Sequence, residues 1–375
     1  MKESYQPLFE SFTFKRGVTL KNRILMAPMT NYASQENGMV SDEELEYYKE
    51  RSNGVGAVIT AVAYVTRDGK GFVNEVSADS DEMIPGLKRL ADTIKGEGAK
   101  AILQIFHAGR MAPPELLEDG QSVSASAVAA ERPGLVTPRE LTEQEIEKII
   151  QAFADATRRA IEAGFDGVEI HGANTYLIQQ FFSPHSNRRN DKWGGTVEKR
   201  MVFPLEVINV VKNTVKEHAR NPFVIGYRIS PEEVENPGIT VEDTLVFADK
   251  LAEQDLDYLH ISVQDFWQGS IRDIDDKKSR VQMIFERVGD KVPVMGVGSL
   301  KTPDDVKKAL ETGVPLVALG RELIVEPKWI QKVQNGEEET IATTLTKHDK
   351  ERLVVPDVLW NNIMTIKGWF PVVEE

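Results

Sequence analysis

Apolar runs alternate with helical patterns eight times along this chain, and this alternation constrains the fold more than any other feature. The runs are mostly continuous rather than alternating, as expected for strands that are buried on both faces. They lie at 23–29, 57–65, 100–107, 166–171, 223–229, 257–263, 292–298 and 315–322. Because no low-complexity break interrupts them, they predict an α/β fold of the (β/α)₈ TIM-barrel type. A doubly wound sheet usually has fewer strands.

Signals of helix starts support the same alternation. Capping-box spacing occurs at Ser41 with Glu44 and at Thr142 with Glu145, and Thr302 before Pro303 is typical of an N-cap followed by the first helical residue. These positions predict helices in the segments that follow the first, third and seventh apolar runs.

Two segments lie outside the β–α count. Residues 1–22 predict a hairpin region around Lys15-Arg16-Gly17, residues 23–340 the barrel, and residues 341–375 a C-terminal extension. The extension contains Trp360, Trp369 and Phe370. Aromatic residues in such a tail usually dock on the body of the protein, and contact with a neighbouring subunit is the alternative. We therefore expect residues 1–375 to form a single domain.

Composition excludes several classes of function. The chain has 59 acidic and 45 basic residues, and a net charge of −14 argues against a general affinity for nucleic acid or anionic membranes. The absence of Cys excludes disulfides, thiolate nucleophiles and iron–sulfur clusters. The first residues lack an apolar signal core. We expect a cytoplasmic enzyme with a small-molecule substrate, without a resident metal, and compatible with a homo-oligomer.

In a barrel of this type the chemistry gathers at the C-terminal ends of the strands. Gly-rich turns follow the last two runs, at Gly296 and Gly298 and at Gly320, and Arg321 stands beside the last of them. Backbone N–H groups in such turns approach a phosphate closely, and an Arg adds a bidentate charge. These residues predict a phosphate site, although the glycines alone are also compatible with relief of crowding.

Gln104 and Arg228 are polar residues near the ends of otherwise apolar runs. An Arg in this position is often half of a structural ion pair. The functional alternative is that both residues contact a flavin lying across the barrel mouth. Gln104 can form a hydrogen bond with the pyrimidine edge of the flavin, and Arg228 can favour its anionic reduced form.

His171, Asn174 and Tyr176 follow the fourth run, ahead of an apolar helical turn. A neutral His and an Asn can donate two hydrogen bonds to one oxygen, which polarises a carbonyl. A Tyr is mostly protonated at neutral pH and is therefore a suitable proton donor to a developing carbanion. The alternative is that Tyr176 is a core residue with a satisfied hydroxyl.

Five segments together resemble the Old Yellow Enzyme family of FMN-dependent ene-reductases. "LKNRILMAPMT", "HAGR", "HGANTYLIQQFFSPHSNRRNDKWGG", "GYRIS" and "ALGREL" occur in the order typical of that family, over about residues 7 to 330. The resemblance implies a (β/α)₈ barrel, non-covalent FMN, and NADH or NADPH as reductant. It also implies hydride transfer from flavin N5 to an activated C=C bond.

The resemblance also implies roles for individual residues. Those expected to surround the isoalloxazine are Pro28, Met29, Thr30, Ala63, Gln104 and Arg228. Those expected to hold the phosphate are Gly298, Ser299, Gly320 and Arg321. His171 and Asn174 are expected to grip the activating oxygen, Tyr176 to donate the proton, and Tyr32 to face the substrate. Thr30 departs from the branch carrying that tyrosine, which usually has Cys at this position.

Two other functions stay open at this point. One is an NAD(P)H:flavin dehydrogenase or oxidase whose acceptor is oxygen, a quinone or a xenobiotic. The other is a flavin-free phosphate-binding lyase or isomerase, although no Lys or metal cluster occupies the strand ends. Substrate choice is expected to depend on 108–139 and 264–275, which carry no strong pattern.

Overall fold

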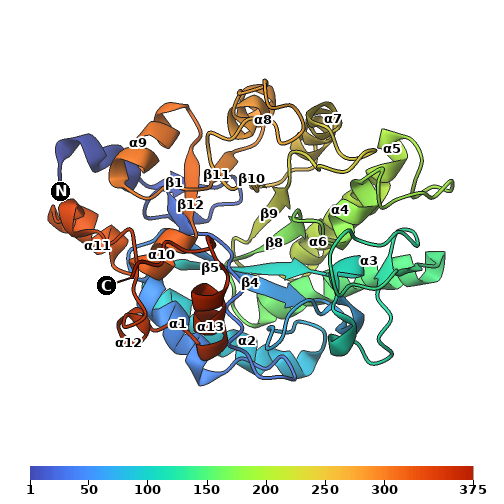
Figure 1. Ribbon diagram of the computed structural model, residues 1–375, viewed down its shortest axis with the longest axis horizontal. Coiled ribbons are helices and arrows are strands. Elements are labelled where there is room, and N and C mark those ends of the chain that lie inside the picture. The colour runs from blue at the N-terminus through green and yellow to red at the C-terminus, as the bar shows by residue number, and fades with distance from the viewer. Residues whose placement is uncertain (375) are drawn as a thin grey trace.

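The computed structural model describes residues 1–374 and contains a closed barrel of eight parallel strands (Figure 1). Strands that follow one another along the chain also lie side by side, which confirms the predicted (β/α)₈ architecture. The barrel strands are β3 (Ile24–Met26), β4 (Ala57–Tyr64), β5 (Lys100–Phe106), β8 (Gly167–Gly172), β9 (Val224–Ile229), β10 (Tyr258–Ile261), β11 (Val294–Val297) and β12 (Leu316–Leu319). Nearly all of their residues are buried, as the continuous apolar runs indicate.

Helices surround the strands on the outside of the barrel. They are α1 (Asp42–Ser52), α2 (Ile84–Gly96), α3 (Glu143–Glu162), α4 (Leu177–Phe182), α5 (Val197–Arg200), α6 (Val202–His218), α7 (Val241–Ala252), α8 (Arg280–Val288), α9 (Pro303–Glu311), α10 (Arg321–Val325), α11 (Trp329–Asn335), α12 (Lys350–Leu353) and α13 (Asp357–Thr365). Short 3₁₀ turns are η1 (Glu3–Phe9), η2 (Arg67–Gly69), η3 (Asp81–Met83), η4 (Gly109–Met111), η5 (Pro114–Leu116) and η6 (Glu338–Thr340).

Two of the expected capping boxes differ in outcome. Thr142 and Glu145 form a complete box at the start of α3. Ser41 caps α1 because its side chain accepts a hydrogen bond from the Glu44 backbone N–H. The Glu44 carboxylate accepts none from the Ser41 backbone, so the box is incomplete. Glu44 is buried and accepts hydrogen bonds from Ser34 and Asn31 instead, because a buried carboxylate needs donors near its own position.

The predicted N-terminal hairpin closes one end of the barrel. Its strands β1 (Phe12–Thr13) and β2 (Thr19–Leu20) are antiparallel. Phe14, Val18 and Leu20 pack with inward side chains of the barrel, and the ring of Phe14 lies 5.8 Å from that of Tyr258. This apolar plug leaves the opposite end, where the strands finish, for the functional site.

The C-terminal extension docks on the barrel, as its aromatic residues predict. Trp360 and Phe370 are buried, and buried Arg51 of α1 donates hydrogen bonds to the carbonyls of Leu353 and Val354. The extension therefore covers the side of the barrel near α1 and reaches the strand ends through residues 368–371.

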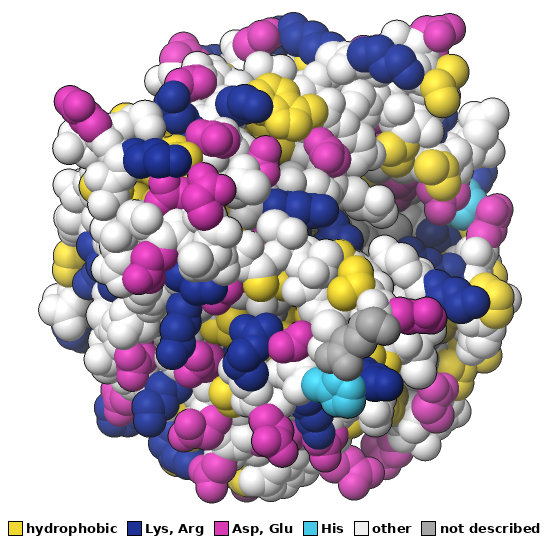
Figure 2. All heavy atoms as spheres, turned by 60° about the vertical axis from the view of Figure 1, so that its left-hand side comes forward, with side chains coloured by type: hydrophobic (Ala, Val, Ile, Leu, Met, Phe, Trp, Pro, Cys, Tyr) yellow, Lys and Arg dark blue, Asp and Glu magenta, His cyan; other side chains and the backbone are white. Residues whose placement is uncertain are grey.

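The surface shows no region of a single charge on the face drawn in Figure 2, where acidic and basic side chains are interspersed. No helix within residues 1–374 is long and apolar enough to cross a membrane.

Candidate functional site

Strand register places two rows of polar side chains inside the barrel. Gln104 pairs with Glu169, Glu169 with Gly226, and Gly226 with Tyr258, so these residues share one level. Two residues further along the strands, His171 pairs with Arg228 and Arg228 with His260. Because side chains alternate along a strand, both rows point inward, the second nearer the strand ends.

The lower row is a hydrogen-bonded network around Glu169. Gln104 Nε2 donates to Glu169 Oε1 at 2.7 Å, and the Tyr258 hydroxyl donates to Oε2 at 2.8 Å. His260 Nδ1 lies 3.0 Å from the same oxygen. Gly226 on β9 leaves room for the Tyr258 ring to reach Glu169, because a Cβ at Gly226 would lie 2.1 Å from that ring. Burial acts to raise the pKa of Glu169, but His260 and Arg228 outweigh it and lower that pKa.

Arg228 is a buried cation whose guanidinium donates no hydrogen bond within residues 1–374. Its Nε is buried without a partner, and the residue lines the main cavity. Burial lowers the pKa of Arg228, and the negative charge of Glu169 opposes this effect. Buried donors without partners are rare in native proteins, so this group points to a ligand that the cavity receives.

The main cavity lies at the C-terminal ends of the strands and has a volume of about 1180 Å³. Eight of the residues predicted from the sequence line it: Pro28, Met29, Asn174, Arg228, Gly298, Ser299, Gly320 and Arg321. The extension contributes Gly368, Trp369, Phe370 and Pro371 to the same wall.

One end of the cavity is lined by the turns after β11 and β12, which contain Gly298, Ser299, Gly320 and Arg321. Gly298 has φ +114°, and a Cβ there would lie 2.8 Å from the Asp265 backbone nitrogen. Ser299 has φ +52° and donates from Oγ to the Gln264 carbonyl at 2.9 Å. Arg321 follows Gly320 and donates from Nη1 to the Trp369 carbonyl at 2.9 Å. Its remaining donors are available to an anion.

Gly296, in contrast, belongs to packing rather than to the phosphate turn. It lies within β11, and a Cβ at this position would come within 2.2 Å of the Phe266 ring. Gly296 is therefore explained by packing. Gly298 also packs closely on the Asp265 backbone, but it lines the cavity, and its phosphate contact stays a prediction.

Glu322 is a buried carboxyl beside the phosphate end, and sequence reasoning did not identify it. Burial raises the pKa of Glu322 to about 8, and its Oε1 has no hydrogen-bond partner within residues 1–374. The group is therefore largely protonated at neutral pH and can donate a hydrogen bond.

The raised pKa of Glu322 predicts a pH-dependent gain in stability on Glu322→Gln. The protonated Glu322 carboxyl contributes to the free energy of unfolding. This contribution is complete below the ordinary pKa of 4.5 and is lost as pH rises through the folded-state pKa of about 8. In cofactor-free protein the substitution should have little effect at pH 5. Above pH 5, Glu322→Gln should stabilise the folded protein relative to wild type by at most about 1.4 kcal/mol for each pH unit, up to the folded-state pKa. Melting temperatures at pH 5 and 9 measure this, with exposed Glu337→Gln as control; equal shifts at both pH values would contradict it.

The β8 loop presents the Asn174 amide in a fixed orientation. The Ser262 hydroxyl donates to Asn174 Oδ1 at 2.7 Å, and the Asn174 backbone N–H donates to Ser230 Oγ at 2.9 Å. Asn174 and Thr175 have φ values of +57° and +69°, which turn the chain sharply ahead of α4. Because Oδ1 is taken by Ser262, the amide NH₂ is the free end at the cavity.

His171 and Tyr176 form an aromatic cluster and adjoin two lining residues, because His171 pairs with Arg228 across the strands and Tyr176 follows Thr175. Their ring centroids are 5.2 Å apart, and Phe106 lies 6.2 Å from His171 and 4.9 Å from Tyr176. Burial and the charge of Arg228 lower the pKa of His171 well below its usual value, so the imidazole is neutral. Burial raises the pKa of Tyr176, so its hydroxyl keeps its proton.

The other predicted residues lie outside the cavity lining, namely Tyr32, Thr30 and Ala63 together with Gln104, His171 and Tyr176. Tyr32, with φ +54°, packs edge-on against Phe72, and its hydroxyl contacts Asn362 of α13. Thr30 is half-buried in the segment after β3. The Ala63 side chain belongs to the apolar cluster around the barrel strands. The proposed cofactor contacts of Thr30 and Ala63 stay predictions.

Sequence reasoning missed Glu169, Tyr258 and His260, although a signal was present. In "GVEIH" Glu169 stands two residues before His171, and in "DYLHIS" Tyr258 stands two residues before His260. A spacing of two within a strand puts both side chains on one face. Polar residues spaced in this way within apolar runs indicate a network inside the barrel.

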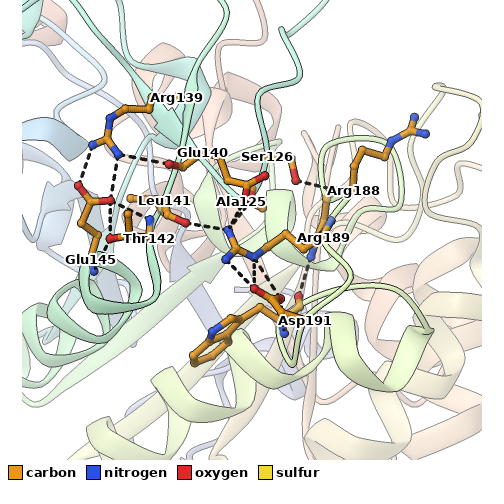
Figure 3. Close-up of polar contacts among 12 residues, drawn as sticks. Ala125, Ser126, Arg139, Glu140, Leu141, Thr142, Glu145, Arg188, Arg189 and Asp191 are labelled. Carbon is orange, nitrogen blue, oxygen red and sulfur yellow. Dashed lines mark hydrogen bonds and ion pairs between the residues drawn. The ribbon is translucent and has the colours of Figure 1, made fainter.

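The polar cluster after α4 braces the loop between β5 and α3 (Figure 3). Arg189 Nη1 donates to the carbonyls of Ala125 and Leu141 at 3.0 and 2.7 Å, and Asp191 pairs with the same guanidinium. Arg188 contacts the 125–141 loop only through its backbone N–H, which donates to Ser126 Oγ. Its exposed side chain donates from Nε to the His185 carbonyl within its own segment.

Arg189→Met should therefore destabilise the protein and loosen residues 125–141. It removes two hydrogen bonds to main-chain carbonyls, a loss of about 1–3 kcal/mol when the acceptors stay buried. The free energy of unfolding and limited proteolysis of the loop measure the effect. Arg188→Met is the matched control and should change neither; equal effects of the two substitutions would contradict the bracing role.

The cavity fits the FMN that the resemblance implies. The unpartnered Arg228 and the turns at Gly298 and Gly320 line the cavity, and the amide of Gln104, fixed by Glu169, lies one row below Arg228 inside the barrel. An elongated ligand with a polar ring edge and a phosphate would satisfy both ends.

Comparisons with known proteins identify the family and the fold of this chain. The model of the NADH:flavin oxidoreductase / NADH oxidase family matches residues 7–340. A probable NADH-dependent flavin oxidoreductase of Bacillus subtilis is 50% identical over 371 residues, 99% of this chain and 99% of that protein. The NADH:acrylate oxidoreductase of Vibrio harveyi is 48% identical over 356 residues, 94% of this chain but 35% of that protein. The solved old yellow enzyme from Trypanosoma cruzi has a TM-score of 0.76 and 28% identity, covering 89% and 93% of the two chains.

Proposed function

Because this chain belongs to the NADH:flavin oxidoreductase / NADH oxidase family, and is thus an NAD(P)H-dependent oxidoreductase with FMN, we propose that it reduces activated C=C bonds. The substrates would be α,β-unsaturated carbonyl compounds and related alkenes. Membership confirms the predicted resemblance to the Old Yellow Enzymes, of which solved homologues share the fold. The acceptor and the roles of individual residues are our proposal.

FMN would be held at two ends of the cavity. Gln104 and Arg228 would meet the pyrimidine end of the ring, with Pro28, Met29, Thr30 and Ala63 around it. Gly298, Ser299, Gly320 and Arg321 would hold the phosphate. When bound, FMN accepts a hydride from NAD(P)H and passes it to the substrate. Arg228 supports this chemistry because its unpaired positive charge stabilises a reduced, anionic ring.

His171 and Asn174 would bind the substrate oxygen. The neutral imidazole offers one N–H, and the Asn174 NH₂ is free because Ser262 occupies Oδ1. Two donors on one oxygen draw electron density from the alkene and make its β-carbon electrophilic. Tyr32, which packs on Phe72 near Tyr176, would border the same substrate space.

Tyr176 would supply the proton to the α-carbon. Its hydroxyl stays protonated because burial raises its pKa, and its ring is fixed between Phe106, Phe72 and His171. The observation that carries the proposal is the placement of His171, Asn174 and Tyr176 together at the end of β8 and in the loop that follows it. A neutral His and an oriented Asn amide provide oxygen binding, and a protonated Tyr stands beside them.

The proposal is tested by separating reduction from reoxidation under anaerobic conditions. Protein that contains FMN should be bleached by NADH or NADPH and should regain its yellow colour when cyclohexenone is added. Bleached protein that stays colourless with every enone, but recovers with oxygen or a quinone, would favour the oxidase alternative. Protein that takes up no FMN would contradict the cofactor assignment itself.

A further inference from the structure

Glu169 is the most enclosed charged group beneath the proposed cofactor site. Its side chain is fully buried, and it lies one row below Arg228 on the neighbouring strand. Because Glu169 is enclosed and Arg228 is mostly buried, solvent screens their interaction less than it would at the surface. Glu169 is the carboxylate that opposes the burial effect on Arg228.

The contacts of Glu169 favour its ionised form. Gln104 Nε2, the Tyr258 hydroxyl and His260 Nδ1 surround its two oxygens at 2.7, 2.8 and 3.0 Å. An ionised carboxylate accepts hydrogen bonds and donates none, so a set of donors suits the negative form. Burying a charge costs desolvation free energy unless the charge interacts with a partner, so the Glu169 carboxylate requires such a partner.

Arg228 supplies that partner without a direct hydrogen bond to Glu169. The guanidinium donors stay free at the cavity, while the carboxylate balances part of their charge from below. Glu169 therefore acts on the cavity indirectly, through two neighbours. Its charge partly offsets that of Arg228. It also accepts a hydrogen bond from the Gln104 NH₂, which leaves the Gln104 side-chain carbonyl free.

We propose that Glu169 is a positioning residue that sets the redox potential of the bound flavin by partly neutralising Arg228. This inference rests on the proposed placement of FMN against Arg228. A cation near the pyrimidine edge stabilises the anionic reduced ring more than the neutral oxidised ring. A carboxylate behind that cation reduces this preference and keeps the potential low.

The test is the midpoint potential of bound FMN in Glu169→Gln, which removes the charge and keeps the shape. With Arg228 unopposed, the equilibrium should shift toward reduced flavin by about tenfold or more, equivalent to about 30 mV for a two-electron couple. An unchanged or lowered potential would overturn the inference. The dissociation constant of FMN and the melting temperature show whether the variant is folded and loaded.

Tyr258→Phe is the matched variant, for which we expect a potential shift of opposite sign. It also tests the inference if Glu169→Gln does not fold. It removes one donor and leaves the carboxylate, so the negative charge is less compensated and the potential should fall. A structural role for the network would disturb FMN in the same direction in both variants. A rise in Tyr258→Phe equal to that in Glu169→Gln would therefore overturn the inference.

Arg228→Met separates this inference from the proposed function. If FMN lies against Arg228, this substitution should lower the potential strongly. A lowered potential in Arg228→Met with no change in Glu169→Gln would overturn only the role of Glu169. No change in Arg228→Met would contradict the placement of the cofactor, and with it the premise.

Discussion

Tyr176→Phe is expected to leave reduction of the flavin by NAD(P)H near its wild-type rate and to slow reoxidation by an enone about 10²–10⁴-fold. Only the second half-reaction needs a proton at the substrate carbon. The Phe ring preserves the contacts with Phe106 and His171, at 4.9 and 5.2 Å, so the cluster should keep its shape. Rapid mixing of the two half-reactions separately gives the rates.

Tyr64→Phe is the matched control for this experiment. Tyr64 belongs to the same apolar cluster as Phe106, but its hydroxyl is directed to the Asn37 carbonyl at 3.5 Å. Its loss should change neither half-reaction. If Tyr176→Phe slowed both halves equally, or neither, Tyr176 would not be the proton donor.

The second large effect is expected for Asn174→Asp. The change keeps the left-handed turn and the hydrogen bond from Ser262, but it replaces the free NH₂ by a carboxylate oxygen. Loss of one donor to a developing oxyanion typically costs about 10²–10³-fold in rate, and the added negative charge opposes the reaction further. Reoxidation by an enone should slow by at least this factor, while reduction by NAD(P)H should change much less.

Ser262→Ala tests whether the amide orientation matters. Without the hydroxyl that holds Oδ1, the Asn174 amide can turn, so reoxidation should slow less than in Asn174→Asp but measurably. If Ser262→Ala were neutral while Asn174→Asp was slow, the donor role would stand and the orienting role of Ser262 would fail. Equal rates of wild type and Asn174→Asp would remove Asn174 from the proposed oxygen site.

The barrel could be predicted from the sequence because its strands are buried on both faces. Continuous apolar runs such as 57–65 and 100–107 correspond to β4 and β5 within a residue or two. Strand-end placement likewise identified Arg228, Gly298 and Arg321, which the structure brings to one cavity. The single-domain organisation of residues 1–375 stays a prediction.

Other features depend on contacts that no local pattern contains. The network of Glu169 joins side chains of β5, β8 and β10 across the intervening β9, and the Ser262 contact with Asn174 joins residues 88 positions apart. The cavity wall from Trp369 depends on where the extension docks, through Arg321. Glu44 shows the converse, since its local capping signal is overridden by buried donors from a different segment.

Product formation under strictly anaerobic conditions tests the central claim, that this cavity reduces activated alkenes, most directly. Purified protein is mixed with NADH or NADPH and cyclohexenone, and both the oxidised nucleotide and cyclohexanone are quantified. We predict one saturated ketone for each nucleotide oxidised, with turnover lost in Tyr176→Phe. Nucleotide oxidation that requires oxygen and yields no saturated product would contradict the account.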